Sequence, residues 1–239
     1  MAARKRAAGK SPKPVPPRRA PTPRGVGHDQ PAKQSAVKKV AARKRNGSKR
    51  GEAKGSKREA KLCLDLAPLE YAQSLIREIK DFPKKGILFY DITTLLADAR
   101  GLQIVIDALA ERLVGQGIDV VVAMESRGFI FGGALAARLN AGFVPVRKPG
   151  KLPYRTDKLA YALEYGEAEL EIHRDAIAPG MRVLILDDLL ATGGTAQATA
   201  RLVENQGGIV VAQAFVIELT FLEGRSRLEP TPVLSLIQY

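Results

Sequence analysis

The segment Val183–Thr195 holds the residue types and spacing best suited to chemistry in this chain. An apolar run ends at Leu186 and delivers two adjacent carboxylates, Asp187 and Asp188, before a short glycine-containing loop. Ligands of open α/β sheets bind beyond the strand ends, and backbone N–H groups at a helix start favour a phosphate. Paired aspartates are suitable acceptors for ribose hydroxyls. The segment therefore predicts a ribose 5-phosphate cradle, with the phosphate held by Ala191, Thr192, Gly193, Gly194 and Thr195.

Other interpretations explain less of this segment. An acidic turn that caps a helix would account for only part of the ordered combination of strand, Asp-Asp, loop and Thr-Gly-Gly-Thr. The Gly-Lys-Ser/Thr of a Walker A loop is absent, and so is the G-x-G-x-x-G of dinucleotide-binding folds. The pattern favours a phosphate-and-ribose site of a different kind.

The same segment resembles the phosphoribosyl pyrophosphate (PRPP) signature of type I phosphoribosyltransferases. From Leu75 to Tyr239 the chain is similar to the adenine-specific branch of that family. Four further stretches carry the resemblance: Asp81–Phe89, Glu125–Phe129, Arg147–Pro153 and Leu163–Gly166. It implies an α/β fold of the type I phosphoribosyltransferase kind, with a mostly parallel central sheet flanked by helices, a small hood and a flexible catalytic loop. It also implies a homodimeric purine-salvage enzyme that joins adenine to C1 of PRPP, giving AMP and pyrophosphate.

Glu125, Ser126 and Arg127 directly follow the apolar run that ends at Met124. A departing pyrophosphate needs backbone N–H groups and a cation near its oxygens. Arg127 offers a planar fork of donors that can engage it, although pairing with a surface acid is the simpler alternative. The resemblance implies that the peptide between Glu125 and Ser126 is cis.

The stretch 147–158 combines basic residues with prolines and a glycine, which predicts a mobile cationic loop. Such a loop would close over the pyrophosphate and exclude water, whereas a plain solvated loop is the alternative. The resemblance implies that one basic residue of the loop reaches the site of the neighbouring subunit. Arg147 and Lys151 are the residues chosen for this role.

A carboxylate near the base could hold a purine proton and stabilise the positive charge that develops on the ring. The residues alone do not distinguish Glu164 from Glu167, Glu169 or Glu171, which alternate along a predicted hairpin edge. The resemblance assigns the role to Glu164 and places Tyr165 at the base.

Three apolar residues complete the adenine site that the resemblance implies. Phe89 and Leu189 would sandwich the base, and Leu88 would offer backbone groups to its edge. Tyr90 is a departure, because many relatives have Arg or Lys at this position. A tyrosine hydroxyl can still donate a hydrogen bond.

Neither His28 nor His173 has partners at metal-ligand spacing, so the sequence predicts no metal site built by the protein. Mg²⁺ is nonetheless expected, held mainly by PRPP oxygens and water, as is usual for hard cations at phosphates.

Hydrophobic periodicity predicts the elements that position these residues. The expected helices are Leu69–Ile79, Leu102–Leu113, Gly128–Leu139 and Thr195–Gln206. The expected strands are Ile118–Met124, Phe143–Val146, Met181–Leu186 and Ile209–Leu219, with a short apolar run at Ile87–Phe89. Strands that alternate with helices favour an α/β fold with a parallel sheet.

The chain divides by composition into a basic extension, residues 1–61, and a domain, residues 62–239. The first part has 20 Lys and Arg against three acids, and the second has 18 against 22. The extension is too poor in apolar residues to bury a core, which predicts disorder. A functionless extension, or one that begins at a start codon assigned too far upstream, is one interpretation. Nonspecific nucleic-acid contact is another, although no aromatic residue is interleaved for base stacking.

The remaining bulk features concern location. The sequence has no apolar run of membrane-spanning length, no apolar core of a secretory signal, and a single cysteine, Cys63. These features predict a cytoplasmic protein without a membrane partner.

Two other functions are compatible with a PRPP site. One is transfer to hypoxanthine, guanine or xanthine, which the Leu163–Gly166 match disfavours because relatives that use 6-oxopurines have other residues around the base. The other is a regulator that binds PRPP only as a signal. Residues 1–61 lack the apolar periodicity for a folded DNA-binding domain, which disfavours the regulator.

Overall fold

A computed structural model of the chain describes residues 67–162 and 167–239. The basic extension, Glu164 and Tyr165 lie outside the described residues, so the expectations that concern them stay predictions.

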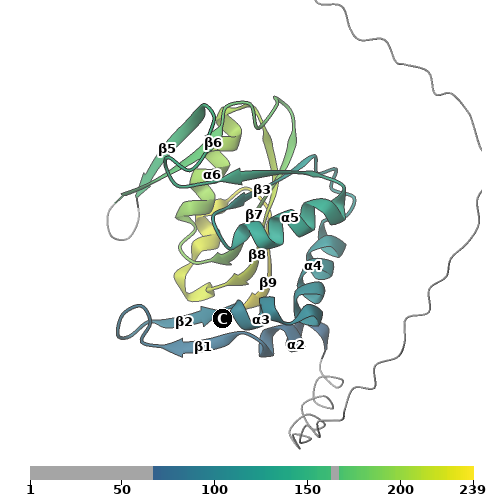
Figure 1. The fold of residues 1–239 in the computed structure, drawn as a ribbon, viewed down its shortest axis with the longest axis vertical. Helices are drawn as coiled ribbons and strands as arrows, with labels where there is room; N and C mark the ends of the chain where they lie inside the picture. Colours follow the sequence, from purple (N-terminus) through teal and green to yellow (C-terminus); the bar gives the residue numbers. More distant parts are fainter. Residues whose placement is uncertain (1–66, 163–166) are drawn as a thin grey trace, which may run out of the picture. The chain divides into compact units, whose positions relative to one another are not determined.

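The centre of the domain is a five-stranded parallel sheet (Figure 1). Its strand order is β4 (Gly142–Val146), β3 (Val120–Met124), β7 (Arg182–Leu190), β8 (Ile209–Glu218) and β9 (Val233–Gln238). The parallel α/β architecture is thus confirmed. β9 was not predicted, because its short alternating pattern follows two prolines and has no strong signal of its own.

Helices cover both faces of this sheet, which explains why its central strands are near-continuous apolar runs. Leu184 and Leu186 of β7 face a core shared with α4 (Ala99–Leu113) and α5 (Gly128–Leu139). Val183 and Ile185 face the opposite core, which is shared with α6 (Gly194–Asn205). Figure 1 shows α4 and α5 on one side of the sheet and α6 on the other.

The helix predicted over Leu69–Ile79 is wrong in its second half. The helix α2 covers Pro68–Ser74, and Arg77–Lys80 forms strand β1, which pairs antiparallel with β2 (Leu88–Asp91). Antiparallel pairing with β2 overrides the local helical pattern. A short helix, α3 (Thr93–Ala97), then leads into α4.

A second two-stranded sheet stands beside the parallel one. Its strands, β5 (Thr156–Ala162) and β6 (Glu167–His173), pair antiparallel, which confirms the hairpin expected near Glu167. Thr156–Lys158 is a strand, however, and not the loop that composition predicted. Leu159 and Tyr161 pack against the core on the α6 side, and this packing explains the extended conformation.

Glu171 of β6 fixes the cationic stretch between β4 and β5. Its buried carboxylate accepts hydrogen bonds from Lys158 Nζ at 2.5 Å and from the Gly150 N–H at 3.2 Å. Its backbone exchanges two hydrogen bonds with Arg147, at 2.7 and 3.0 Å. Through these contacts Glu171 holds both ends of the stretch 147–158.

A buried carboxylate also joins the last two strands to a short 3₁₀ helix, η2 (Gly224–Leu228). Glu218 accepts hydrogen bonds from both Arg225 Nε (3.0 Å) and Arg225 Nη2 (2.5 Å), and from Ser235 Oγ and Gln238 Nε2. Hydrogen bonds from Arg225, and less strongly from Ser235, lower the pKa of Glu218 although burial opposes them.

Replacing Glu218 with glutamine is expected to lower the free energy of unfolding by about 1–3 kcal/mol at neutral pH, because charge-assisted hydrogen bonds are lost. A lowered folded-state pKa means that the contribution is complete above the ordinary carboxyl value of 4.5 and disappears as pH falls through the folded value. Urea unfolding from pH 3 to 7 tests this. The two proteins should converge in acid, and an equal gap at every pH would contradict the assignment. Glu204→Gln, on the exposed side of α6, is the control.

Candidate active site

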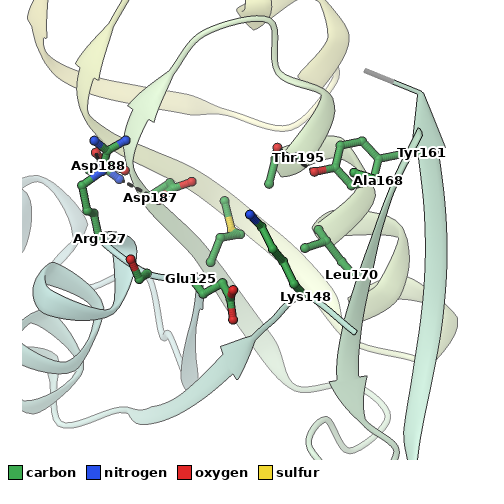
Figure 2. A pocket seen from close by; sticks show the side chains of 11 residues that line it. Glu125, Arg127, Lys148, Tyr161, Ala168, Leu170, Asp187, Asp188 and Thr195 are labelled. Carbon is green, nitrogen blue, oxygen red and sulfur yellow. Dashed lines mark hydrogen bonds and ion pairs between the residues drawn. The ribbon is translucent and has the colours of Figure 1, made fainter. Parts of the chain in front are cut away.

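The strand ends of β3 and β7 open into a cavity of about 580 Å³. Pairing between the two strands stops at Ala123 and Leu186, so Asp187 is the first residue of β7 beyond it. The walls come from the segment after β3, the start of the cationic stretch, the β5–β6 sheet, β7 and α6 (Figure 2). The lining residues are Met124, Glu125, Ser126, Arg127, Lys148, Tyr161, Ala168, Leu170, Asp187, Asp188 and Thr195.

Arg127 and Asp188 form the central ion pair of this cavity. Arg127 Nε lies 2.7 Å from Asp188 Oδ2, and the Asp188 side chain is only 8% exposed. The guanidinium carbon of Arg127 also lies 5.8 Å from the centre of the Phe89 ring on β2. The structure therefore brings together Arg127, which is predicted to bind pyrophosphate, Asp188, which is predicted to bind ribose, and Phe89, which is predicted to bind the base.

Asp187 extends into the cavity beside this pair (Figure 2). Burial and the neighbouring Asp188 charge raise the pKa of Asp187 well above its ordinary value. The close packing depends on Gly128, because a Cβ there would lie 2.7 Å from Asp187 Oδ1. A cation or a hydroxyl donor bound at this point would favour the ionised form of Asp187.

The predicted phosphate loop forms a smaller cavity of about 80 Å³ at the start of α6. Its walls include Ala191, Thr192, Gly193, Gly194 and Thr195, all five of the residues predicted to hold the phosphate. Gly193 has φ +79°, a conformation that favours glycine. The loop thus has the backbone geometry of an anion site at the N-terminus of a helix.

Gly224 supports this loop from outside, and sequence reasoning missed it. A Cβ at Gly224 would lie 2.1 Å from the Ala191 carbonyl oxygen and 3.0 Å from the Gly193 nitrogen. No motif links Gly224 to the loop in the sequence; only the folded chain brings them together.

Glu125 gathers the two cations that the resemblance selected. Arg147 Nε lies 2.9 Å and Lys151 Nζ 2.5 Å from its carboxylate, which is 6% exposed. Burial alone would raise the pKa of Glu125, but hydrogen bonds from Lys151 and Arg147 outweigh it and lower that pKa. The Glu125–Ser126 peptide is cis, as expected. The contacts described here lie within one chain, so the role of either cation in a neighbouring subunit stays a prediction.

Two polar residues, Lys148 and Tyr161, line the larger cavity although they were not among the predicted site residues. Lys148 was noted only as part of a basic stretch, yet Figure 2 shows its side chain extending into the cavity. Tyr161 places its hydroxyl 3.1 Å from Thr195 Oγ1. The basic composition of the stretch 147–158 indicated that Lys148 could bind an anion. The alternating pattern of β5 gave no indication that Tyr161 would line the cavity.

The residues predicted to bind adenine are only partly brought together. Leu88 and Phe89 lie on β2, where the Phe89 ring packs edge-on against Phe82 at 5.1 Å. Leu189 lines the cavity of the phosphate loop. Glu164 and Tyr165 are outside the described residues, so the base sandwich stays a prediction.

The described ranges contain no group of three or more His, Cys, Asp or Glu arranged to hold a metal ion. Asp187 and Asp188 nevertheless offer hard oxygen donors in a cavity where Asp187 has a raised pKa. Within the described residues the two carboxylates share one ion pair, with Arg127, and so could accept a divalent cation that arrives with a phosphorylated ligand. Among the described helices, none is long and apolar enough to cross a membrane.

Comparisons with known proteins agree with this geometry. A sequence model of the phosphoribosyl transferase domain matches residues 92–232. The adenine phosphoribosyltransferase of Sorangium cellulosum is 62% identical over 176 residues, which cover 72% of this chain and 88% of that protein. That of Chloroflexus aurantiacus is 60% identical over 166 residues, covering 70% and 96% respectively.

Solved structures give the same result. The crystal structure of adenine phosphoribosyltransferase from Thermoanaerobacter pseudethanolicus has a TM-score of 0.70 and 56% identity, covering 72% of this chain and 99% of that one. The Saccharomyces cerevisiae enzyme, solved with an imino-altritol bisphosphate and adenine, has a TM-score of 0.66 and 44% identity, with coverages of 70% and 98%.

Proposed function

Because this chain belongs to the phosphoribosyltransferase family, among the adenine phosphoribosyltransferases, we propose a division of roles among its site residues. The chain transfers the 5-phosphoribosyl group of PRPP to adenine, giving AMP and pyrophosphate in purine salvage. The observation that carries the assignment of roles is the meeting of the Asp187–Asp188 pair, Arg127 and the glycine loop at one edge of the sheet.

Asp187 and Asp188 hold the ribose hydroxyls, and the loop Ala191–Thr195 holds the 5-phosphate. Support comes from their position: the acids border the larger cavity, and the loop forms the smaller one. Backbone amides of the loop need no reorganisation when the phosphate arrives, so they fix C1 of the ribose relative to the other groups.

Arg127 stabilises the departing pyrophosphate, assisted by Lys148, Arg147 and Lys151, while Glu125 and Ser126 border the same space. As the C1–O bond to pyrophosphate breaks, negative charge grows on the leaving group, and fixed cations stabilise it. Arg127 is already oriented by Asp188, and Lys148 extends into the cavity.

Adenine attacks C1 with its N9 atom, through an oxocarbenium-like transition state, and the N9–C1 bond forms as the C1–O bond breaks. The Glu164 carboxylate accepts a hydrogen bond from a purine proton and so stabilises the positive charge that develops on the ring, and the N9 proton leaves as AMP forms. Phe89 and Leu189 sandwich the base, with Leu88 and Tyr165 at its edge. Phe89 has support from its proximity to Arg127. No covalent enzyme intermediate is required.

Magnesium accompanies PRPP in this proposal. The Asp187 and Asp188 carboxylates would border a Mg²⁺ ion held mainly by PRPP oxygens and water, and that ion would supply neutralisation of the diphosphate charge. The proposal also includes a homodimer in the cytoplasm, in which Arg147 or Lys151 reaches the partner's site.

Assays of pyrophosphate release from PRPP, with and without Mg²⁺, test this function. Adenine, hypoxanthine, guanine and xanthine are offered separately. Release with adenine, accompanied by AMP, is expected. Release with a 6-oxopurine instead would refute the base assignment, and PRPP binding without release for any base would favour the regulatory alternative.

Residues 1–61 are an appendage to the catalytic domain, and nonspecific contact between this appendage and nucleic acid is a secondary proposal. Relatives align over about 70% of this chain yet are covered over 88–96% of their own length, which supports a catalytic unit without the extension. Deletion of residues 1–60 is therefore expected to leave kcat and both KM values unchanged in steady-state assays. Substantial loss of turnover in the folded, shortened protein would contradict the appendage.

A further inference from the structure

The β1–β2 sheet has only two strands, and it is not hydrogen-bonded to the five-stranded sheet. A two-stranded sheet is marginally stable by itself, so its position depends on contacts with the rest of the domain. This position matters for the reaction because Leu88 and Phe89 lie on β2.

Tyr90 of β2 makes one such contact. Its ring stacks on the ring of Tyr239, with centroids 4.0 Å apart and planes inclined by 29°. Figure 1 shows the end of the described chain beside β2. Both rings pack against the core that contains Ile92 and Leu95. Tyr90, which departs from the family pattern, thus has an aromatic partner, Tyr239, that is distant in the sequence.

Tyr239 is itself held firmly. The Tyr239 N–H donates to the Glu218 carbonyl at 3.0 Å. The backbone carbonyl oxygen of Tyr239 accepts from the Thr220 N–H at 2.9 Å and from Thr220 Oγ1 at 2.7 Å. The Gln73 side chain of α2 hydrogen-bonds the phenol. The Tyr239 ring is therefore a fixed surface against which Tyr90 rests.

Phe89 lies on the other face of the same strand, because consecutive side chains of a strand point to opposite faces. It packs on Phe82 and lies 5.8 Å from the guanidinium carbon of Arg127, which pairs with Asp188. Loss of the contact beneath the Tyr90 ring would shift β2, and Phe89, the preceding residue of that strand, would shift with it.

We propose that Tyr239 is a positioning residue for adenine: it supports Tyr90 and so holds Phe89 at the proper distance from Arg127. The inference rests on the proposed function, in which Phe89 contacts the base. It predicts a larger effect on adenine than on PRPP, since the acids and the phosphate loop lie on β7, on α6 and between them, and not on β2.

Steady-state kinetics of the full chain provide the main test. Tyr239→Ala is expected to raise KM for adenine about 3- to 10-fold, the range of one aromatic pair, and to change kcat and KM for PRPP less than about 2-fold. Tyr239→Phe keeps the stack and should restore KM for adenine. Phe221→Ala removes an aromatic side chain that is 68% exposed on the neighbouring 3₁₀ helix, and it should have no effect.

A replacement variant, a double variant and a spectroscopic measurement keep the test decisive. Tyr239→Leu preserves apolar volume and removes the stack, so it replaces the alanine variant if that one does not fold. Combining it with Tyr90→Leu should raise KM for adenine no further than either change alone, because both remove one contact. The chain has no tryptophan, so near-ultraviolet circular dichroism reports on its tyrosines and should change on loss of the stack.

Three outcomes would overturn the proposal: an unchanged KM for adenine in a folded Tyr239→Ala protein, an equal rise in both KM values, or a failure of Tyr239→Phe to rescue. Failure of the proposed function is a separate result, since it would appear in the wild-type protein as absence of pyrophosphate release with adenine.

Discussion

Replacement of Arg127 by alanine should lower kcat/KM for PRPP by about 100- to 1,000-fold, as expected when one fixed donor to a developing anion is lost. The change removes the ion pair with Asp188, whose side chain is 8% exposed. It leaves a buried carboxylate without its cation, next to Asp187. Initial-rate measurements with varied PRPP at saturating adenine test the prediction.

The pH dependence of Arg127→Ala gives a second readout. Arg127 lowers the pKa of Asp187 against the stronger effects of burial and the Asp188 charge. Without it the pKa of Asp187 rises further, so activity that needs ionised Asp187 should be lost at a higher pH than in the wild type. Arg201→Ala, on the exposed side of α6, is the control. An unchanged acid limb together with unchanged kcat/KM would remove Arg127 from the site.

Replacement of Gly224 by alanine should lower kcat/KM for PRPP by about 100-fold, although Gly224 is not among the residues proposed to bind substrate. The added Cβ would lie 2.1 Å from the Ala191 carbonyl oxygen, so the phosphate loop must move. Overpacking of this kind also costs about 1–3 kcal/mol of stability. Kinetics and thermal unfolding of the same preparation measure both effects.

Gly133→Ala is the matched control for that experiment. A Cβ at Gly133 meets nothing within 4 Å, and the residue lies within α5. Alanine is favoured over glycine inside a helix by about 1 kcal/mol, so this change should stabilise the protein and leave kinetics unaltered. If Gly224→Ala behaves like Gly133→Ala, the contact between Gly224 and the loop does not matter for binding.

The parts that the sequence predicted well share a physical cause. The central strands are buried on both faces, so Val120–Met124 and Val183–Leu186 appear as apolar runs whatever surrounds them. The polar residues that follow such strands, Glu125–Arg127 and Asp187–Asp188, are then expected at one edge of the sheet. The structure places them there.

The parts that the sequence did not predict depend on partners distant in the chain. Arg77–Lys80 has a helical pattern but pairs with β2, and Thr156–Lys158 has a loop composition but pairs with β6. Tyr161, Gly224 and Tyr239 act through contacts that no local pattern encodes. Local periodicity cannot report which distant backbone a residue will meet.

The ion pairs of Glu125 have a consequence for the affinity of the enzyme. A buried carboxylate already occupies Arg147 and Lys151. If these cations engage pyrophosphate as proposed, binding is an exchange of one anion for another, and its net free energy is a difference between the two. Under that assignment the Glu125 carboxylate would weaken capture of pyrophosphate and would take back the two cations as the product departs. Glu125 would then act as an internal competitor that limits product inhibition at the expense of tight binding.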